Sequence, residues 1–482
     1  MPAIHHGRSV PGALLLTATL LLYLGAAALV GAAPASAAPP PATSAAGPSG
    51  SADGLLALLA VQQAQLIATD GADTDLFGSS VAVSGDTAVV GALYDDVGGN
   101  TQQGSAYVFV RSGTTWSEQQ KLTAADGAAG DWFGNSVALT GDTVVVGARD
   151  DDNANADQGS VYVFTRSGTT WSEQQKLTVA DGGASDYFGR SVAVSRETAV
   201  VGAFGDDVGA NADQGSAYVF ARSGTTWSQQ AQLTANDGAA NDWCGFSVAI
   251  SGDTAVVGAE WDDVGVNANQ GSAYVFVRSG TVWSQQQQLT AADGATEDWF
   301  GGAVALSGET AVVGAQRDHV GITADQGSAY VFARSGTIWS QQSQLTASDG
   351  AASDQFGFSV GFSGDTAVVG AYSDDVGATD QGSAYVFTGV AAKPGTPVAT
   401  SPKGLISSRT PAFRWTAAAG AATYEVRVYK GSRLIRKKAG IKKLSWKFTT
   451  ALPRKVRLTW TVRARNAGGW GAWSAKPWFE VR

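Results

Sequence analysis

Cysteine and histidine are almost absent from this chain of 482 residues. It has one Cys, so no intrachain disulfide can form, and three His, of which only His319 lies outside the N-terminal tail. A Ser-His-Asp site would therefore need His319, a thiol site would need Cys244, and a zinc site lacks ligands. The sequence thus predicts no catalytic residue and argues against an enzyme of these types.

Charge is scarce and unevenly distributed. Only 15% of the residues are charged, and the net charge is -10. Residues 391–482 contain 20 Lys and Arg but only Glu425 and Glu480, whereas the rest of the chain contains 12 basic and 40 acidic residues. Such a split affects the choice of partners and solubility, and does not determine the fold.

The N-terminus has the features of a secretory signal peptide. An apolar run covers residues 13–33 and is followed by Ala35-Ser36-Ala37, a small-x-small cleavage pattern. We expect a signal peptide over residues 1–37, which places the protein outside the cell or on its surface. An uncleaved membrane anchor is the alternative, because the run is long enough to span a bilayer. Residues 38–56 form a linker rich in Pro, Ala, Ser and Gly.

A Phe-Gly pair recurs about every 56 residues, which is the main feature of the sequence. It begins at Phe77, Phe133, Phe188, Cys244 in place of Phe, Phe300 and Phe356. A fixed period of this length indicates one supersecondary unit per repeat. In the second copy, SVALT, TVVVGA, SVYVFTR and WSEQQKLT read as strands, joined by tight turns at Gly141-Asp142 and Ser167-Gly168.

Four antiparallel strands per repeat predict an all-β fold, a six-bladed β-propeller over residues 57–389. The Phe of each Phe-Gly pair and the Trp of each fourth strand are expected in the core between blades. The last copy stops at Phe387 without a fourth strand, and residues 61–66 match the strand that is missing. We expect this N-terminal strand to complete the last blade and close the ring, which would remove exposed strand edges.

The repeats resemble the FG-GAP repeat of integrin alpha-subunit propellers and of many bacterial surface and secreted proteins, the bacterial form more closely. Phe77-Gly78 followed by Val90-Gly91-Ala92 carries this resemblance. It implies a propeller used for extracellular recognition. Integrin propellers have seven blades, and this chain has six copies, so six or seven blades stay open. The calcium loop of the family, D-x-D-x-D-G, is replaced by short turns such as Ser84-Gly85-Asp86, so its ligands cannot be transferred.

Acidic residues repeat in two loops that this strand order places at one end of every blade. The loop between blades carries Asp70/Asp75, Asp126/Asp131, Asp181/Asp186, Asp237/Asp242, Asp293/Asp298 and Asp349/Asp354. The loop between strands two and three carries Asp95-Asp96, Asp151-Asp152, Asp206-Asp207, Asp262-Asp263, Asp318-His319 and Asp374-Asp375. Arg-Ser-Gly turns lie at the opposite end, which we expect to be weakly positive.

Two interpretations of the acidic end stay open. In one, the Asp side chains hold turns together and keep the ring soluble. In the other, carboxylates of the two loops bind a hard cation such as calcium, and the candidate ligands are Asp126, Asp131, Asp151, Asp152 and their equivalents in the other repeats.

The C-terminal part lacks the repeat. Residues 390–397 read as a linker, and residues 398–482 alternate apolar and polar residues as a β-sandwich does. Two runs, FRWTAAAGAATYEVRVY and WTVRARNAGGWGAWS, resemble a fibronectin type III domain. The cluster from Arg433 to Lys443 is expected on a loop or an edge strand. Its basic face is either simply solvated, or a site for an anionic surface or wall polymer, or a dock for the acidic propeller; nucleic acid is not an expected partner.

These observations predict a secreted or cell-surface binding protein of the adhesion type. Its acidic propeller face would meet an extracellular protein or glycan. The alternatives are a carbohydrate-active enzyme that works in the central channel and a purely structural surface protein. A polar residue unique to one blade on a first strand would favour the enzyme.

Overall fold

The computed structural model describes residues 63–391, 395–418, 421, 423–466 and 469–482. The predicted signal peptide and the linker after it lie outside these residues. Every regular element in the described ranges is a strand. No described helix is long and apolar enough to cross a membrane. The all-β fold class is therefore confirmed.

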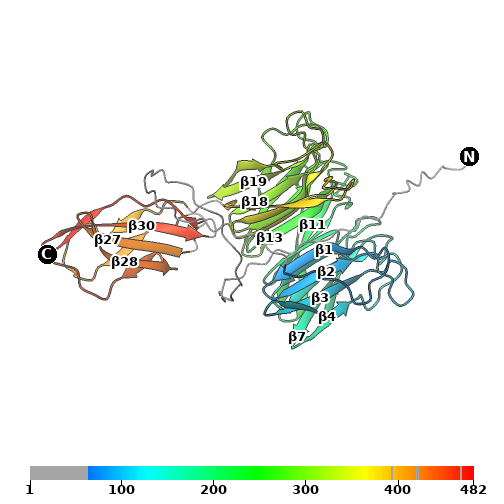
Figure 1. The fold of residues 1–482 in the computed structure, drawn as a ribbon, viewed down its shortest axis with the longest axis horizontal. Coiled ribbons are helices and arrows are strands. Elements are labelled where there is room, and N and C mark those ends of the chain that lie inside the picture. Colours follow the sequence, from blue (N-terminus) through cyan, green and yellow to red (C-terminus); the bar gives the residue numbers. More distant parts are fainter. Residues whose placement is uncertain (1–62, 392–394, 419–420, 422, 467–468) are drawn as a thin grey trace, which may run out of the picture.

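Six antiparallel sheets follow one another along the chain (Figure 1). The first three are β1 (Phe77–Ser84), β2 (Thr87–Ala92), β3 (Ser105–Ser112) and β4 (Thr115–Leu122); β5 (Phe133–Thr140), β6 (Thr143–Ala148), β7 (Ser160–Ser167) and β8 (Thr170–Leu177); and β9 (Ser191–Ser195), β10 (Thr198–Ala203), β11 (Ser216–Ser223) and β12 (Thr226–Leu233). The others are β13 (Cys244–Ser251), β14 (Thr254–Ala259), β15 (Ser272–Ser279) and β16 (Val282–Leu289); β17 (Phe300–Ser307), β18 (Thr310–Ala315), β19 (Ser328–Ser335) and β20 (Ile338–Leu345); and β21 (Phe356–Ser363), β22 (Thr366–Ala371) and β23 (Ser383–Thr388).

The predicted strands of the second copy coincide with β5 to β8. The turns also lie where expected, since Thr140 pairs with Thr143 and Ser167 with Thr170. The second strand of each of the first five sheets is rich in Ala and Val and buried on both faces, as β6 shows along its whole length. A strand buried on both faces reads as continuous apolar sequence, which explains why TVVVGA does not alternate.

The core lies between successive sheets. Phe133 is fully buried and makes edge-to-face contacts with Tyr162 and Phe164 of its own sheet. The same cluster includes Val89 and Val108 of the sheet before it. Cys244 takes the place of Phe in the fourth sheet and is equally buried. The prediction that the Phe-Gly position forms the core between blades is confirmed.

Glycine sets the distance between neighbouring sheets. A Cβ added at Gly258 on β14 would collide with the backbone carbonyl of Gly301 on the next sheet. The same contact recurs from Gly91 to Gly134, Gly147 to Gly189, Gly202 to Gly245 and Gly314 to Gly357. A serine hydroxyl reinforces four of these contacts, for example Ser247 Oγ to the Gly301 oxygen at 2.7 Å. The Gly in Val-Val-Gly-Ala is thus required by the neighbouring blade.

The first and last sheets do not meet in this structure. Each sheet packs on the next through its first strand, but β21 and β1 make no contact of comparable extent. The blue first sheet and the yellow last sheet belong to different halves of the repeat array in Figure 1. Their outer faces are open, since Val386 is 43% exposed whereas Val331 at the same place in the fifth sheet is 1% exposed.

The N-terminal segment lies where a fourth strand would precede the first sheet. Gln63 Oε1 accepts a hydrogen bond from Trp116 Nε1 at 3.2 Å, just as Gln119 does from Trp171 at 2.9 Å. Leu66 packs on the core of the first sheet. Residues 63–66 nevertheless form no strand, and β23 is bonded only to β22 among the described residues. Residues 61 and 62 are outside the described residues, so the predicted closure by residues 61–66 is not observed and stays a prediction.

The last sheet contains the glycine that contacts the next blade in the other repeats, but no blade lies against it in this structure. An added Cβ at Gly370 would meet no neighbouring sheet, only the hydroxyl of Ser359, although the five equivalent glycines all press on the following blade. In the repeat pattern, the backbone of Gly78 would occupy this position. These unused features fit a ring in which the first sheet follows the sixth.

The C-terminal part contains two sheets that share one core. One sheet has the order β24 (Ala399–Ser401), β26 (Ala412–Trp415) and β29 (Ser445–Lys447). The other contains β25 (Gly404–Ile406), β32 (Trp478–Val481), β30 (Arg457–Asn466), β27 (Thr423–Lys430) and β28 (Arg433–Ile441), with β31 (Gly469–Trp470) beside β30. Phe413 meets Trp460 and Phe479 edge to face across this core. The basic cluster forms β28, an edge strand as expected.

Ring closure predicts the effect of alanine at Gly370. If the first sheet packs on the last, Gly370→Ala should lower the free energy of unfolding by about 1–3 kcal/mol through overpacking, as Gly258→Ala should. Gly361→Ala is the matched control, because a Cβ there has open space. Chemical unfolding of the three variants measures this, with light scattering to confirm a monomer. Equal stability of the Gly370 and Gly361 variants would show that the ring stays open.

Deletion of residues 57–68 is a second test of ring closure. If the N-terminal segment closes the ring, the deletion should lower the melting temperature and promote association.

Candidate functional site

The two acidic loops of each repeat lie together at one end of the sheets. In the first sheet, the amide of Tyr94 donates to the Asp75 carbonyl at 3.1 Å, which joins the loop after β2 to the loop before β1. The loops after the second strands of the first five sheets also meet the following blade, as the amide of Phe133 donates to the Gln103 carbonyl at 2.8 Å. We call this surface the loop end.

The second Asp of each loop between blades closes that loop. Asp131 Oδ2 accepts a hydrogen bond from the Ala128 amide at 2.6 Å, and the other five repeats contain the same bond. Asp131 is nearly fully buried. Burial raises the pKa of Asp131, Asp186 and Asp298 to about 6 and that of Asp242 to about 7.

The first Asp of the loop between blades and the first Asp after the second strand contact the same tyrosine and the same lysine in the second sheet. Asp126 Oδ1 and Asp151 Oδ2 lie 2.8 and 2.7 Å from the Tyr162 hydroxyl, and Lys176 Nζ lies 2.8 Å from both carboxylates. The first sheet repeats this arrangement with Lys121. In the third to fifth sheets, however, Gln232, Gln288 and Gln344 replace the lysine and donate to the second carboxylate.

The second Asp of the loop between strands two and three closes that loop, as Asp152 does in the second repeat. Asp152 Oδ1 accepts a hydrogen bond from the Asp157 amide at 2.8 Å, and four other repeats have an equivalent bond. His319 stands at this place in the fifth repeat and faces the Asp325 amide at 3.4 Å. The four candidates Asp126, Asp131, Asp151 and Asp152 are therefore close together, but each has a structural partner.

No group of three His, Cys, Asp or Glu side chains suited to a metal occurs in the described residues. Calcium would need backbone carbonyls or water beside the Asp pairs. The pairs that lack a lysine, such as Asp237 with Asp262, offer the least competition for a cation. Calcium binding stays a prediction.

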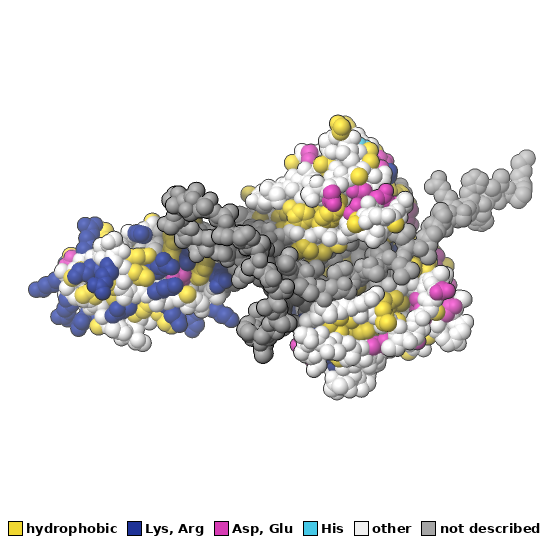
Figure 2. Space-filling view, in the orientation of Figure 1, with side chains coloured by type: hydrophobic (Ala, Val, Ile, Leu, Met, Phe, Trp, Pro, Cys, Tyr) yellow, Lys and Arg dark blue, Asp and Glu magenta, His cyan; other side chains and the backbone are white. Residues whose placement is uncertain are grey.

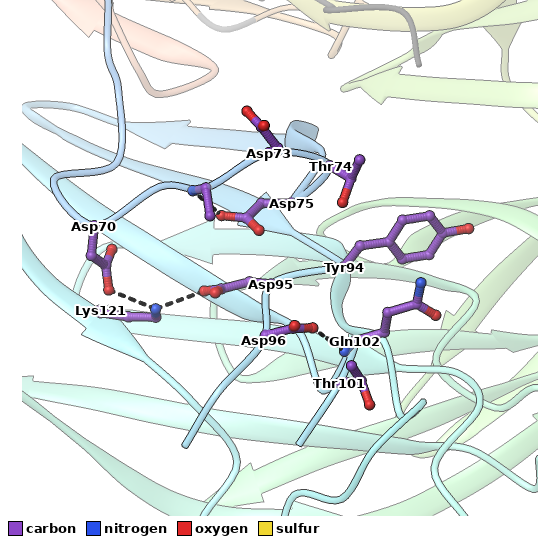
Figure 3. A pocket seen from close by; sticks show the side chains of 11 residues that line it. Asp70, Asp73, Thr74, Asp75, Tyr94, Asp95, Asp96, Thr101, Gln102 and Lys121 are labelled. Carbon is purple, nitrogen blue, oxygen red and sulfur yellow. Dashed lines mark hydrogen bonds and ion pairs between the residues drawn. The ribbon is translucent and has the colours of Figure 1, made fainter. Parts of the chain in front are cut away.

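A pocket of about 310 Å³ opens at the loop end of the first sheet (Figure 3). Asp70, Asp75, Asp95 and Asp96 line it, together with Lys121, whose ammonium bridges Asp70 and Asp95. Thr74 also lines the pocket. In the second sheet, the equivalent residue Gly130 donates its amide to the Thr101 carbonyl of the preceding blade at 3.0 Å. The pocket therefore borders the place that a preceding blade would occupy.

The opposite end of the sheets is neutral rather than positive. Each Arg-Ser-Gly arginine pairs with an acidic residue of the neighbouring turn, as Arg278 does with Asp253 at 2.7 Å. Arg111, Arg166, Arg222 and Arg334 are paired in the same way, with Asp86, Asp142, Glu197 and Glu309. The expectation of a weakly positive rim overlooked the acid in the first turn.

A continuous row of aromatic and arginine side chains crosses the loop end. The row, which we call the girdle, consists of Tyr94, Trp132, Arg149, Tyr187, Phe204, Trp243, Trp261, Trp299 and Arg317. Phe204 stacks on Tyr187 with ring centroids 4.9 Å apart, and Trp261 stacks on Trp243 at 3.6 Å. The girdle spans the first five sheets, and all its members are half-buried.

A second group lies beside the girdle. Arg190, next to the start of β9, holds its guanidinium 4.2 Å from the ring centre of Phe246. Glu260, directly after β14, is 3% exposed. Burial raises the pKa of Glu260 to about 8 and lowers that of Arg190 to about 10. Glu260 Oε2, Arg190 Nε and Trp261 Nε1 are buried without a hydrogen-bond partner.

Sequence reasoning missed the girdle because it sought blade-specific residues within the SVAVS strands. The girdle lies just outside them, in the residue before each Phe-Gly pair and the two after each Val-Gly-Ala. These positions differ from copy to copy while their neighbours repeat. Aligning the six copies and marking the variable columns would have revealed it.

The FG-GAP repeat matches this chain in six places: residues 60–109, 116–164, 171–220, 227–276, 283–332 and 339–387. Together these matches cover more than half of the sequence. The chain belongs to the FG-GAP repeat family. The first FG-GAP match begins at residue 60, so it aligns the N-terminal segment with the fourth strands Trp116–Leu122 and their equivalents. No curated protein matches the chain.

The raised pKa values of the buried Asp residues predict stability that falls as pH rises. A folded-state pKa of about 6 or 7 lies above the usual value of 3.8. The folded state then binds more protons than the unfolded state between these values, and its stability decreases from about pH 4 to pH 7. The melting temperature of the whole protein should therefore rise when the pH is lowered from 7.5 to 5. Asp242→Asn should weaken this dependence, and an unchanged profile would contradict it.

The calcium hypothesis predicts heat on titration and a higher melting temperature with calcium than with chelator. Asp237→Asn should reduce the effect more than Asp126→Asn, because Lys176 already neutralises the pair that contains Asp126. Calorimetric titration of the protein checks this. Absence of both heat and thermal shift would remove the hypothesis.

Proposed function

We propose that this protein is a secreted or cell-surface binding protein of the adhesion type. Membership of the FG-GAP repeat family supports this, because such repeats suggest an integrin-like propeller, which is often related to adhesion. The predicted signal peptide over residues 1–37 supports the location. The partner is an extracellular protein or glycan, which meets the loop end of the sheets.

The girdle is the observation that carries this proposal. Half-buried aromatic side chains in a continuous row are typical of recognition surfaces, where Trp, Tyr and Arg dominate the binding energy. The other repeated positions serve packing, ion pairs or loop closure. The acidic residues around the girdle disfavour anionic partners at this end.

The basic C-terminal part supports a second contact. Figure 2 shows Lys and Arg side chains gathered over this part of the chain. Arg433, Lys437 and Lys438 of the edge strand β28 are exposed. We propose that this surface holds the protein on an anionic surface or wall polymer. Its resemblance to fibronectin type III domains fits an accessory role next to an adhesion module.

Not every basic residue is free for such a partner. Glu425 is 1% exposed and pairs with Arg427 at 2.6 Å, with Arg463 at 2.9 Å and with Lys437 of β28 at 3.5 Å. The guanidinium of Arg463 also lies 4.1 and 4.3 Å from the ring centres of Trp470 and Trp473. Arg427 and Arg463 are therefore not free to bind an anionic surface.

A carbohydrate-active enzyme is the second candidate. Arg190, Glu260 and Asp150 are each found in one repeat only, as a catalytic constellation would require. Glu260, with a pKa of about 8, would be protonated at neutral pH, as a general acid must be. Hydrolysis of a bound glycan, lost in Glu260→Gln, would favour this alternative over binding alone.

Secretion and adhesion give the direct test. The full chain expressed in a secreting host should leave the cytoplasm and begin at Ala38 after cleavage. The mature protein should then bind immobilised extracellular proteins or glycans in a surface plasmon resonance assay. Retention in the cytoplasm, or no binding across both classes, would contradict the proposal.

A further inference from the structure

We propose that the girdle, with Arg190 and Glu260, binds a neutral saccharide chain. This inference rests on the proposed function and specifies the chemical class of the ligand. It is carried by four features of the described residues: the variable residue types in the girdle columns, aromatic rings at a left-handed backbone position, unpaired buried polar atoms and the balance of charge.

The columns that form the site vary in residue type next to an invariant Val-Gly-Ala. Val-Gly-Ala is identical in all six copies, and the next two residues are Leu93-Tyr94, Arg149-Asp150, Phe204-Gly205, Glu260-Trp261, Gln316-Arg317 and Tyr372-Ser373. Packing between sheets involves the identical residues and imposes no single choice on the columns that follow. The aromatic and charged residues there have another use.

The backbone at the girdle opposes the side chains that it carries. Trp132, Tyr187, Trp243 and Trp299 have φ between 56° and 57°, in the left-handed region. Gly or Asn is the usual residue there, and a bulky side chain is an outlier. Leu76 and Gln355 have φ of 54° and 58° at the same position, so this conformation belongs to every repeat. Four successive repeats nevertheless place an aromatic ring there.

Unpaired polar atoms point to a missing partner. The Glu260 side chain is only 3% exposed, and its Oε2 has no hydrogen-bond partner in the described structure. This oxygen lies close to Gly302, where an added Cβ would approach it within 2.6 Å. A buried polar atom without a partner is costly, and a ligand hydroxyl at this place would satisfy it. Trp261 Nε1 is a further unpaired donor next to Glu260.

The charges of the site nearly balance. Arg149 pairs with Asp150 at 3.4 Å and Arg317 with Asp325 at 3.5 Å, so neither arginine offers an unpaired charge to an ionic ligand. The Asp pairs of the surrounding loops would repel a polyanion. What the site offers is aromatic faces, planar guanidinium groups and a carboxyl group. Sugar rings present apolar C–H faces to aromatic rings and neighbouring hydroxyls to planar polar groups. The length of the girdle, which crosses five sheets, fits a chain of several sugars better than a monosaccharide.

Titration of the mature protein with neutral hexasaccharides tests this inference. The probes are hexamers of β-1,4-glucose, β-1,4-N-acetylglucosamine and α-1,4-glucose, with hexagalacturonate and hexalysine as charged counterparts. Calorimetry and tryptophan fluorescence report binding. We expect at least one neutral hexamer to bind at least tenfold more tightly than either charged probe.

Two substitutions with matched controls separate binding from stability. Glu260→Gln and Trp299→Asn should each weaken binding of the neutral hexamer at least tenfold without lowering the melting temperature, because neither side chain belongs to the core between sheets. Glu309→Gln alters a carboxylate at the opposite end, and Gln355→Asn alters the position of Trp299 in the sixth repeat. Both controls should bind as the wild type does.

Three outcomes would overturn the inference. These are no binding of any neutral hexamer, tighter binding of a charged probe, or unchanged affinity in both site variants. The proposed adhesion function is tested separately. If Glu260→Gln and Trp299→Asn still adhere to the extracellular partner, the adhesion function stands and only the saccharide site is ruled out.

Discussion

The approach of one sheet to the next through glycine is the constraint on which the repeat array depends. At Gly258 and its equivalents, the carbonyl of the following Phe-Gly pair lies where a side chain would begin. This contact fixes the spacing, and the buried Phe, Tyr and Val side chains fill what remains. It also explains why a chain with few charges and no disulfide is organised by repetition. Each sheet is an incomplete core, and its neighbour completes it.

The same glycine contact indicates how the two ends of the array fit each other. The last sheet retains Gly370, and the first begins with a Phe-Gly pair, although neither has the neighbour that the other repeats have. Gln65 stands where Gln232 does in the third repeat, and Gln232 bonds to Asp206. A closed ring would bring Gln65 to Asp374 in the sixth repeat. The ends of the array are thus complementary in residue type at several independent positions.

The strands, the hairpin turns and the core positions could be predicted from the sequence because they repeat. Period-two patterns and Gly-Asp or Ser-Gly turns act locally, and six copies remove ambiguity. The partners of the Asp residues could not be predicted in this way. Tyr162 and Lys176 are far from Asp126 in sequence. The antiparallel pairing of β7 with β8 places Tyr162 beside Lys176, and the loop between β4 and β5 brings Asp126 to both. The girdle was missed for a different reason, since attention to what repeats hides what varies. Its strain at Trp132 and Trp243 depends on a backbone angle that composition does not reveal.

The girdle columns have a consequence for how this chain can change. Residues that hold the sheets together and the residues that we propose face a saccharide occupy separate positions, even where they lie close in sequence, as Gly258 and Glu260 do. Substitutions in the variable columns can therefore alter specificity without disturbing assembly of the array. Duplication of a repeat would copy the scaffold and supply fresh columns for diversification. The architecture is in this respect comparable to a display framework, in which a constant frame carries a small, replaceable set of recognition residues.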